Sequence, residues 1–198
     1  MKKILLVLAI CCTTLSYAQE KGQWIIGGNA GYNSDKNENE NESSTTKTFT
    51  LSPSIGYMLN SKIAIGLGFN YSTADEELEN IYYGYSMNYK TTSFGINPYV
   101  RIHKNITERF LLFVQPGIFY STNKIEYDDS EDDVKLKGFG LDCSLGFLYF
   151  ISDKLSLELN VLSVDYSSLE ETDGEYKNES FGINYNLTSP NMGLRYYF

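Results

Sequence analysis

The sequence predicts an all-β chain that folds as an eight-stranded, antiparallel, up-and-down transmembrane β-barrel. Apolar residues alternate with small or polar residues at a period of two through most of the chain, which is typical of strands. The 198 residues include 17 Tyr, 11 Phe and 16 Gly but only 4 Pro, which favours sheet. Outside the N-terminus no apolar run reaches the ~18 residues that a membrane-spanning helix needs.

Residues 1–18 are predicted to be a secretory signal peptide. A short basic start is followed by an apolar run that ends in small residues at Ser16 and Ala18, as a cleavage site requires. Cleavage leaves residues 19–198 as one domain with Cys143 as its only cysteine, so the ladder and packing must hold it together without an internal disulfide. The alternatives are a short anchor helix, or a lipoprotein modified at one of the two cysteines before the cleavage point.

The first four predicted strands are recognised by apolar side chains at every second position. Their outer faces carry Trp24, Ile26, Ala30 and Tyr32, then Phe49, Leu51, Pro53, Ile55 and Tyr57, then Ile63, Ile65, Leu67, Phe69 and Tyr71, and then Phe94, Ile96, Pro98 and Val100. No residue on these faces is charged, and with their flanks the segments reach the ~9–11 residues that a tilted strand needs to cross a bilayer.

The last four predicted strands continue the same pattern. Their outer faces carry Leu112, Val114, Pro116, Ile118 and Tyr120, then Phe139, Leu141, Cys143, Leu145, Phe147 and Tyr149, then Leu155, Leu157, Leu159 and Val161, and finally Pro190, Met192, Leu194, Tyr196 and Phe198. Prolines fall inside four of the eight strands, where they cannot donate to a ladder, so they predict β-bulges. A change of parity before the last strand predicts a further bulge at 188–190.

The connections alternate between short and long. The short ones span 58–62, 103–108 and 151–154, and the long ones span 33–47, 74–90, 122–137 and 168–179. The long connections are predicted to be loops, and they hold 19 of the 25 acidic residues. An antiparallel meander would therefore have one tight rim and one elaborated, acidic rim.

The residues between the apolar positions form the opposite face of these strands, and the composition of that face decides which face meets water. Eleven of its 28 residues are Gly and only four are charged, which suits the narrow lumen of an eight-stranded barrel and not a water-facing sheet. The apolar face is then the outside and requires lipid. Aromatic residues at the strand ends predict girdles at the two interfaces: Trp24, Tyr32, Tyr57, Tyr71, Tyr120 and Tyr149. The alternative is a soluble, lipocalin-like barrel with the apolar face inside.

Four charged residues are predicted to face the lumen: Arg101, Asp142, Glu158 and Arg195. Buried charges persist only when they are paired, so these four predict a charge network. Glu158 and Arg195 lie on adjacent strands and are the first pair expected. We expect the network to fill the lumen, because eight strands leave no open aqueous channel.

No catalytic, metal or cofactor site is predicted. His103 is the only histidine, and it lies in a short turn where exposure is expected. The acids of 128–133 lack the spacing of an EF-hand, so a solvated negative rim is expected, with Ca²⁺ binding as the alternative. The Tyr-rich segment 81–85 is expected to extend the barrel wall, with an adhesive or sugar-binding patch as the alternative. The net charge of −9 argues against nucleic-acid binding.

The export signal, the meander and the ending Arg195-Tyr196-Tyr197-Phe198 resemble small bacterial outer-membrane β-barrels. The nearest type is the OmpX/OmpW-like group, or "outer membrane protein beta-barrel domain" group, common in Bacteroidota. The resemblance implies export through the Sec pathway, residence in the outer membrane and contact with its lipids. It also implies that the barrel assembly machinery recognises Leu194, Tyr196 and Phe198.

The function expected from these features is a structural or adhesive one, without enzymatic activity, for a monomeric barrel whose acidic loops contact an extracellular ligand. One alternative is a narrow, porin-like channel for small hydrophobic solutes with a lateral opening, as proposed for OmpW-like proteins. The other is a soluble barrel that binds an apolar ligand.

Overall fold

The computed structural model describes residues 20–39, 42–80, 85–128, 133–172, 174, 176–185 and 191–198. The predicted signal peptide and the predicted bulge at 188–190 lie outside these residues. No helix in the described ranges is long and apolar enough to cross a membrane. The described strands are β1 (Trp24–Glu38), β2 (Glu42–Met58), β3 (Ile63–Asn80), β4 (Tyr85–Asn105), β5 (Phe110–Tyr127), β6 (Val134–Phe150), β7 (Leu155–Glu171), β8 (Lys177–Tyr185) and β9 (Asn191–Tyr197).

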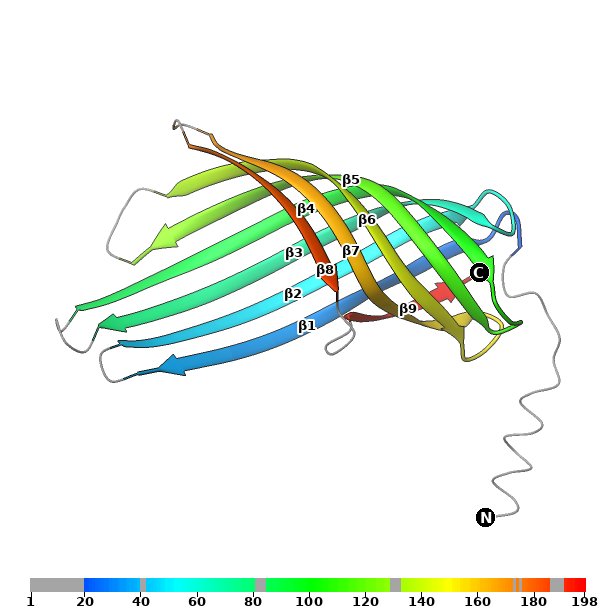
Figure 1. The fold of residues 1–198 in the computed structure, drawn as a ribbon, viewed down its shortest axis with the longest axis horizontal. Coiled ribbons are helices and arrows are strands. Elements are labelled where there is room, and N and C mark those ends of the chain that lie inside the picture. Colours follow the sequence, from blue (N-terminus) through cyan, green and yellow to red (C-terminus); the bar gives the residue numbers. More distant parts are fainter. Residues whose placement is uncertain are drawn as a thin grey trace, which may run out of the picture.

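These strands form an eight-stranded antiparallel barrel, as predicted (Figure 1). β1 to β7 pair in chain order, and β9 closes the ring by pairing with both β1 and β7. β8 pairs with the part of β7 beyond β9, so β8 and β9 share the eighth position. Tyr185, at the end of β8, pairs with Leu162 of β7, and Asn191, at the start of β9, pairs with Asn160. Two strands that lie six residues apart in the chain therefore continue along nearly adjacent positions of β7.

The two ends of the barrel differ, and we name them the turn end and the hairpin end. The short turns lie at the turn end, where the first and last strands meet through Trp24 N donating to Phe198 O at 2.8 Å. At the hairpin end the predicted loops are mostly strand: β1 continues to Glu38 and β2 begins at Glu42. The loop prediction was wrong because the alternation and the one-to-one pairing continue there, as in Glu38 with Ser43.

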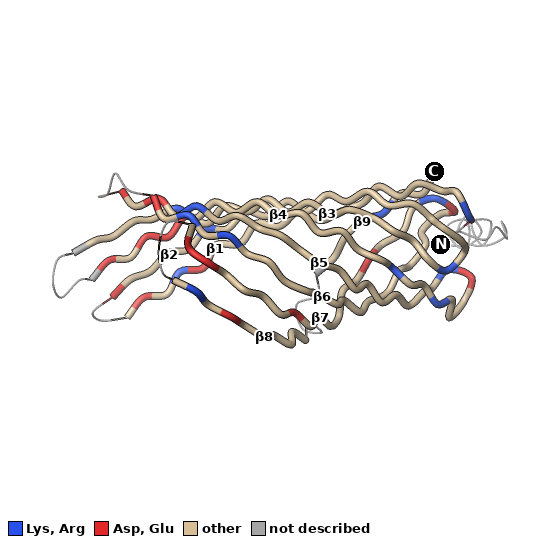
Figure 2. The backbone as a smooth tube through the Cα atoms, turned by 90° about the horizontal axis from the view of Figure 1, so that it is seen from above, with Lys and Arg blue, Asp and Glu red and all other residues tan. Residues whose placement is uncertain are grey.

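We call these continued strands the extension: residues 33–39, 42–48, 72–80, 85–92, 122–128, 133–138, 168–172 and 176–180. The part between the extension and the turn end is the spanning barrel. Its outer face is apolar and exposed, as at Ile65, Val100 and Leu141. Figure 2 shows the acidic residues concentrated along the hairpins of the extension.

The prolines do not create the predicted bulges. The register is the same on both sides of Pro98, with Ile96 opposite Tyr120 and Tyr99 opposite Gly117. Asn97 Nδ2 instead donates to Ile118 O at 2.9 Å, which replaces the hydrogen bond that the proline nitrogen cannot make.

The register is likewise unchanged around Pro53 and Pro116, so a missing donor is tolerated there without an inserted residue. Pro190 lies outside the described residues.

A register shift occurs instead between β6 and β7, at Leu145 and Gly146. It leaves Val161 of β7 unpaired and buried, which corrects the prediction that Val161 faces outward. Beyond this bulge the outward positions of β7 become even-numbered, so Leu162 and Tyr166 join the outer face.

The turn end of the lumen is filled by an apolar cluster, which we call the plug: Ile25, Met58, Ala64, Leu111, Phe113, Leu148, Phe150 and Tyr197. His103 lies in β4 and is only 2% exposed, so the expectation of an exposed histidine was wrong. It continues the inward parity of Arg101, and β4 extends two residues past it before the turn begins.

Candidate functional site

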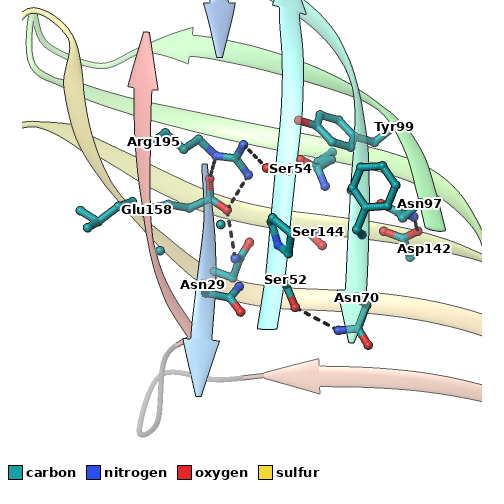
Figure 3. A pocket seen from close by; sticks show the side chains of 18 residues that line it. Asn29, Ser52, Ser54, Asn70, Asn97, Tyr99, Asp142, Ser144, Glu158 and Arg195 are labelled. Atoms are coloured by element: carbon teal, nitrogen blue, oxygen red, sulfur yellow. Dashed lines mark hydrogen bonds and ion pairs between the residues drawn. The ribbon is translucent and has the colours of Figure 1, made fainter. Parts of the chain in front are cut away.

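Three of the four predicted lumen charges meet in one buried cluster. Arg101 donates to Glu158 from Nη1 to Oε2 at 2.5 Å and from Nη2 to Oε1 at 3.2 Å. Arg195 donates to the same carboxylate from Nε to Oε2, and from Nη2 to Oε1 at 3.2 Å (Figure 3). One carboxylate therefore holds two guanidinium forks, and the cluster keeps an excess of one positive charge.

Neutral groups hold the remaining parts of both arginines. Arg101 donates from Nε to Gln115 at 2.7 Å, and its guanidinium lies 4.0 Å above the ring of Phe113. Arg195 donates from Nη1 to Ser54 at 3.2 Å. The cluster thus connects β2, β4, β5, β7 and β9 across the lumen, and each arginine is fixed by packing as well as by charge.

Asp142 lies apart from this cluster, nearer the hairpin end. Its carboxylate accepts a hydrogen bond from Asn97 Nδ2 at 2.7 Å. Asp165 is its direct partner across β6 and β7, and Asn184 donates to Asp165 at 3.1 Å. The fourth predicted member therefore belongs to a second, acidic group. Among the described residues no three His, Cys, Asp or Glu side chains are placed to hold a metal ion.

The lumen is hollow between the arginines and the hairpin end. A cavity of about 360 Å³ extends from Arg195 and Glu158 past Asn29 and Asn70 (Figure 3). A second cavity of about 450 Å³ lies towards the extension, and the two share Asn70, Asn97 and Asp142 in their walls. Amides and hydroxyls line much of the first cavity, whereas aromatic residues such as Phe119 and Tyr120 contribute to the wall of the second.

Between the arginines and the turn end the lumen is closed. The plug fills the section between the cluster and the turn end. The side chains of His103 and Ser156 are buried there as well. A hydrated ion would have to displace both the charge cluster and the plug to pass through.

The wall of the barrel has an unpaired edge, which we call the seam. β1 pairs with β9 only over Ile25–Gly28, and within the described residues neither the rest of this edge of β1 nor the free edge of β8 has a strand partner. Gly28 marks the point of departure with a φ of +154°, where a Cβ would lie 2.5 Å from Ser52 O. Tyr32 and Phe181 beside the seam are 70% and 68% exposed, against 43% for Tyr120 within the wall.

The extension reverses the distribution of side chains found in the spanning barrel. Its inner face on β3 to β7 carries eight large apolar or aromatic side chains, with ring centroids of Tyr89 and Tyr127 5.9 Å apart. The residues are Leu78, Met87, Tyr89, Ile125, Tyr127, Val134, Leu136 and Leu169. On these strands the outer face of the extension carries Thr, Ser, Asn, Lys, Asp and Glu only.

Charges in the extension are sorted by face. All seven of its lysines, each within the described ranges, lie at outward positions: Lys36, Lys47, Lys90, Lys124, Lys135, Lys137 and Lys177. The inner face carries Asp35, Glu42, Glu76 and Glu171, and no described residue there is basic. Tyr89 donates to Glu76, and this hydrogen bond, with burial, raises the pKa of Tyr89 to about 12.

The other predicted site residues all lie on the outer face. Trp24, Tyr57 and Tyr149 are near the turn end, with ring centroids of Trp24 and Tyr57 5.2 Å apart. Tyr32, Tyr71 and Tyr120 lie at the base of the extension. The proposed assembly signal, Leu194, Tyr196 and Phe198, is exposed on and just after β9.

Sequence reasoning missed the plug and the inner face of the extension. Both could have been found by extending the inward parity of each strand past the segments taken as strands. From Arg101 this parity reaches His103 towards the turn end, and from Asn97 it reaches Tyr89 and Met87 towards the hairpin end. The seam had no comparable signal, because it depends on pairing between distant segments.

Comparisons with known proteins agree with this architecture. The family model described as outer membrane protein beta-barrel domain matches residues 4–188. OprG of Pseudomonas aeruginosa is similar in structure, with a TM-score of 0.58 and 16% identity over 92% of this chain and 99% of that chain. At this identity the likeness concerns the fold alone. No curated protein matches the sequence.

Two further solved structures align at lower scores. Neisserial surface protein A has a TM-score of 0.49 and 15% identity over 90% of this chain and 98% of its own. Ail, the attachment invasion locus protein of Yersinia pestis, has a TM-score of 0.43 and 12% identity over 90% and 99%.

Proposed function

Because the chain belongs to the outer membrane protein beta-barrel domain family, we propose that it is a non-conducting, non-enzymatic anchor that displays the extension outside the bacterial outer membrane. The family assignment replaces the alternative of a soluble, lipocalin-like barrel. The observation that carries the proposal is the double obstruction of the lumen by the Arg101–Glu158–Arg195 cluster and the plug. Export through the Sec pathway and a monomeric state are part of the same proposal.

Outer-membrane lipids are the first partners in this proposal. The exposed apolar face of the spanning barrel suits acyl chains. The outward lysines begin next to the aromatic residues, on the side of the hairpin end. Lys47 lies two residues before Phe49 in β2, and Lys137 lies two residues before Phe139 in β6. Cationic side chains at this level match the anionic headgroups of an outer leaflet.

Planar bilayers test the absence of conductance. We expect the purified barrel to give no unit currents, and the variant Glu77→Gln, which changes a charge only on the outside of the extension, to behave identically. Unit currents from the unaltered protein that change in size with Gln115→Ala, beside Arg101 in the lumen, would overturn the proposal.

A lateral route for small hydrophobic solutes is the second candidate, and the seam favours it. Gly28 and Leu194, where the β1–β9 pairing ends, also line the cavity of about 360 Å³. Continuing the register places Ala30 opposite Met192. In a Cys143→Ser background, a disulfide between cysteines at these two positions should abolish passage of an apolar dye into vesicles if the route exists. The matched control joins Ala30 to Leu51, which are already paired.

The C-terminal residues are proposed to guide assembly. We expect deletion of Phe198 to lower the amount of folded barrel in cells and to leave refolding of the purified chain in detergent unchanged. An equal loss in both settings would indicate that Phe198 acts only as an interface anchor, through contacts such as its stacking with Tyr196 at 6.3 Å between centroids.

A further inference from the structure

We propose that the inner face of the extension binds a cationic peptide segment with apolar side chains, held against β3 to β7. This inference rests on the proposed function, in which the extension is the working surface of the anchor. Three independent features of the described residues define the partner: the apolar inner face, the sign of its charges and the free strand edges beside it.

The apolar inner face lies between Tyr32, Tyr71 and Tyr120, at the base of the extension, and the hairpin end. It therefore lies outside the hydrocarbon. Leu78 and Met87 pair across β3 and β4, and Ile125 and Val134 pair across β5 and β6. These side chains remain partly exposed, and Leu78 is 39% exposed. An exposed apolar surface in water is typical of an interaction site, and no described strand covers this one.

The charges on this face select the sign of the partner. Glu76 and Glu171 lie among the apolar residues, and Asp35 lies on the inner face of β1. Every lysine of the extension points the other way, and five of the seven pair with outer acids, as Lys177 does with Glu179 at 3.0 Å. An inner face with acids and without bases attracts Lys or Arg side chains.

The free edges favour a peptide over a small amphiphile. Within the extension, β8 has one edge without a described strand partner along Lys177–Ser180, and β1 has one along Asn33–Glu38. Unpaired backbone donors and acceptors accept an added strand. A lipid or detergent could cover the apolar residues but would not pair with these edges as an added strand does.

Binding of synthetic peptides tests the proposal directly. The probe is a dye-labelled 12-residue peptide of alternating Leu and Lys, titrated against the full-length barrel in nanodiscs of zwitterionic lipid, with empty nanodiscs as the blank. Peptides of alternating Leu and Glu, and of alternating Ser and Lys, separate charge from apolar contact. We expect saturable binding of the first peptide and at least about tenfold weaker binding of the other two.

Neighbouring acids on opposite faces provide the matched variants. Glu76→Gln with Glu171→Gln removes two inner charges, whereas Glu77→Gln with Glu170→Gln removes two outer charges from adjacent positions. We expect the inner pair to weaken binding about tenfold and the outer pair to change it less than about twofold. Heat-modifiable mobility verifies that both variants are folded.

The outcomes separate this inference from the proposed function. Equal weakening by both variant pairs would mean that only the general negative charge of the extension acts, and the inference would be wrong. It would also be wrong if the Leu–Lys peptide did not bind, or if the Ser–Lys or Leu–Glu peptide bound as tightly. A failure of the anchor function is detected independently, as unit currents in bilayers.

Discussion

In β3, Phe69 and Tyr71 face lipid, and only a few residues later Asp75 and Glu77 face water from the same side of the same strand. The inner face changes in the opposite sense, from Asn70 in the lumen to Leu78 in the extension. The backbone ladder continues through both regions without a change of register. The hydrogen-bonded sheet therefore sets the shape, while the surrounding medium decides which face is apolar.

Removing the only anion of the lumen cluster should have the largest effect. Glu158→Leu leaves Arg101 and Arg195 buried without their shared partner, so the free energy of unfolding should fall by about 3–5 kcal/mol. Urea unfolding in lipid vesicles measures it. Glu77→Leu in the extension, which breaks only an exposed pair with Lys47, is the control. A similar small loss in both variants would contradict a structural role for the cluster.

A cation placed on the lipid-facing side of the spanning barrel should be next in size. Leu145→Arg on β6 should cost about 2–4 kcal/mol, because a guanidinium would lie near the middle of the bilayer. Ser86→Arg introduces the same group on the outer face of the extension, opposite Glu79, and should leave unfolding unchanged. If Leu145→Arg assembled and unfolded normally, the outer face would not be the lipid-facing one.

The spanning barrel was predictable because, outside the bulge in β7, small inward residues alternate with mostly apolar outward ones. The pairing of Glu158 with Arg195 could be anticipated, since buried charges of opposite sign on adjacent strands require each other. The participation of Arg101 from β4 could not be assigned by adjacency, because it reaches Glu158 across the lumen.

The extension was misread because Asp and Glu were taken as signs of loops. Their alternation with residues such as Leu78 and Val134 is the pattern of a strand in water. The bulge at Val161 was missed because a Val fits an outward position as well as a buried one, although the apolar positions change from odd to even at Leu162, Val164 and Tyr166. Both features were therefore present in the periodicity of the strands.

Glycine positions show where the barrel wall is tightly packed and where it is open. A Cβ at Gly140 would lie 2.2 Å from Tyr166 O and 2.5 Å from the ring of Phe119, whereas a Cβ at Gly31, beside the seam, would meet nothing within 4 Å. Gly140→Ala should therefore cost about 1–3 kcal/mol by overpacking, and Gly31→Ala should change stability by less than about 0.5 kcal/mol. Thermal unfolding in detergent compares them, and a comparable cost at Gly31 would show that the seam is packed.

The smallest expected effect concerns an exposed charge pair of the extension. Lys177 lies 3.0 Å from Glu179, and its hydrogen bond and charge lower the pKa of the Glu179 carboxyl below its usual value. A depressed pKa stabilises the folded state at pH values above the unfolded pKa, and this contribution is lost as the pH falls through the folded pKa. Carboxyl NMR should show the Glu179 titration moving upward in Lys177→Gln. An unchanged titration would mean that water screens the Lys177–Glu179 pair completely. The buried pairs of Glu158 join the same two kinds of charge, so the difference between the two sites would then come from the surrounding medium.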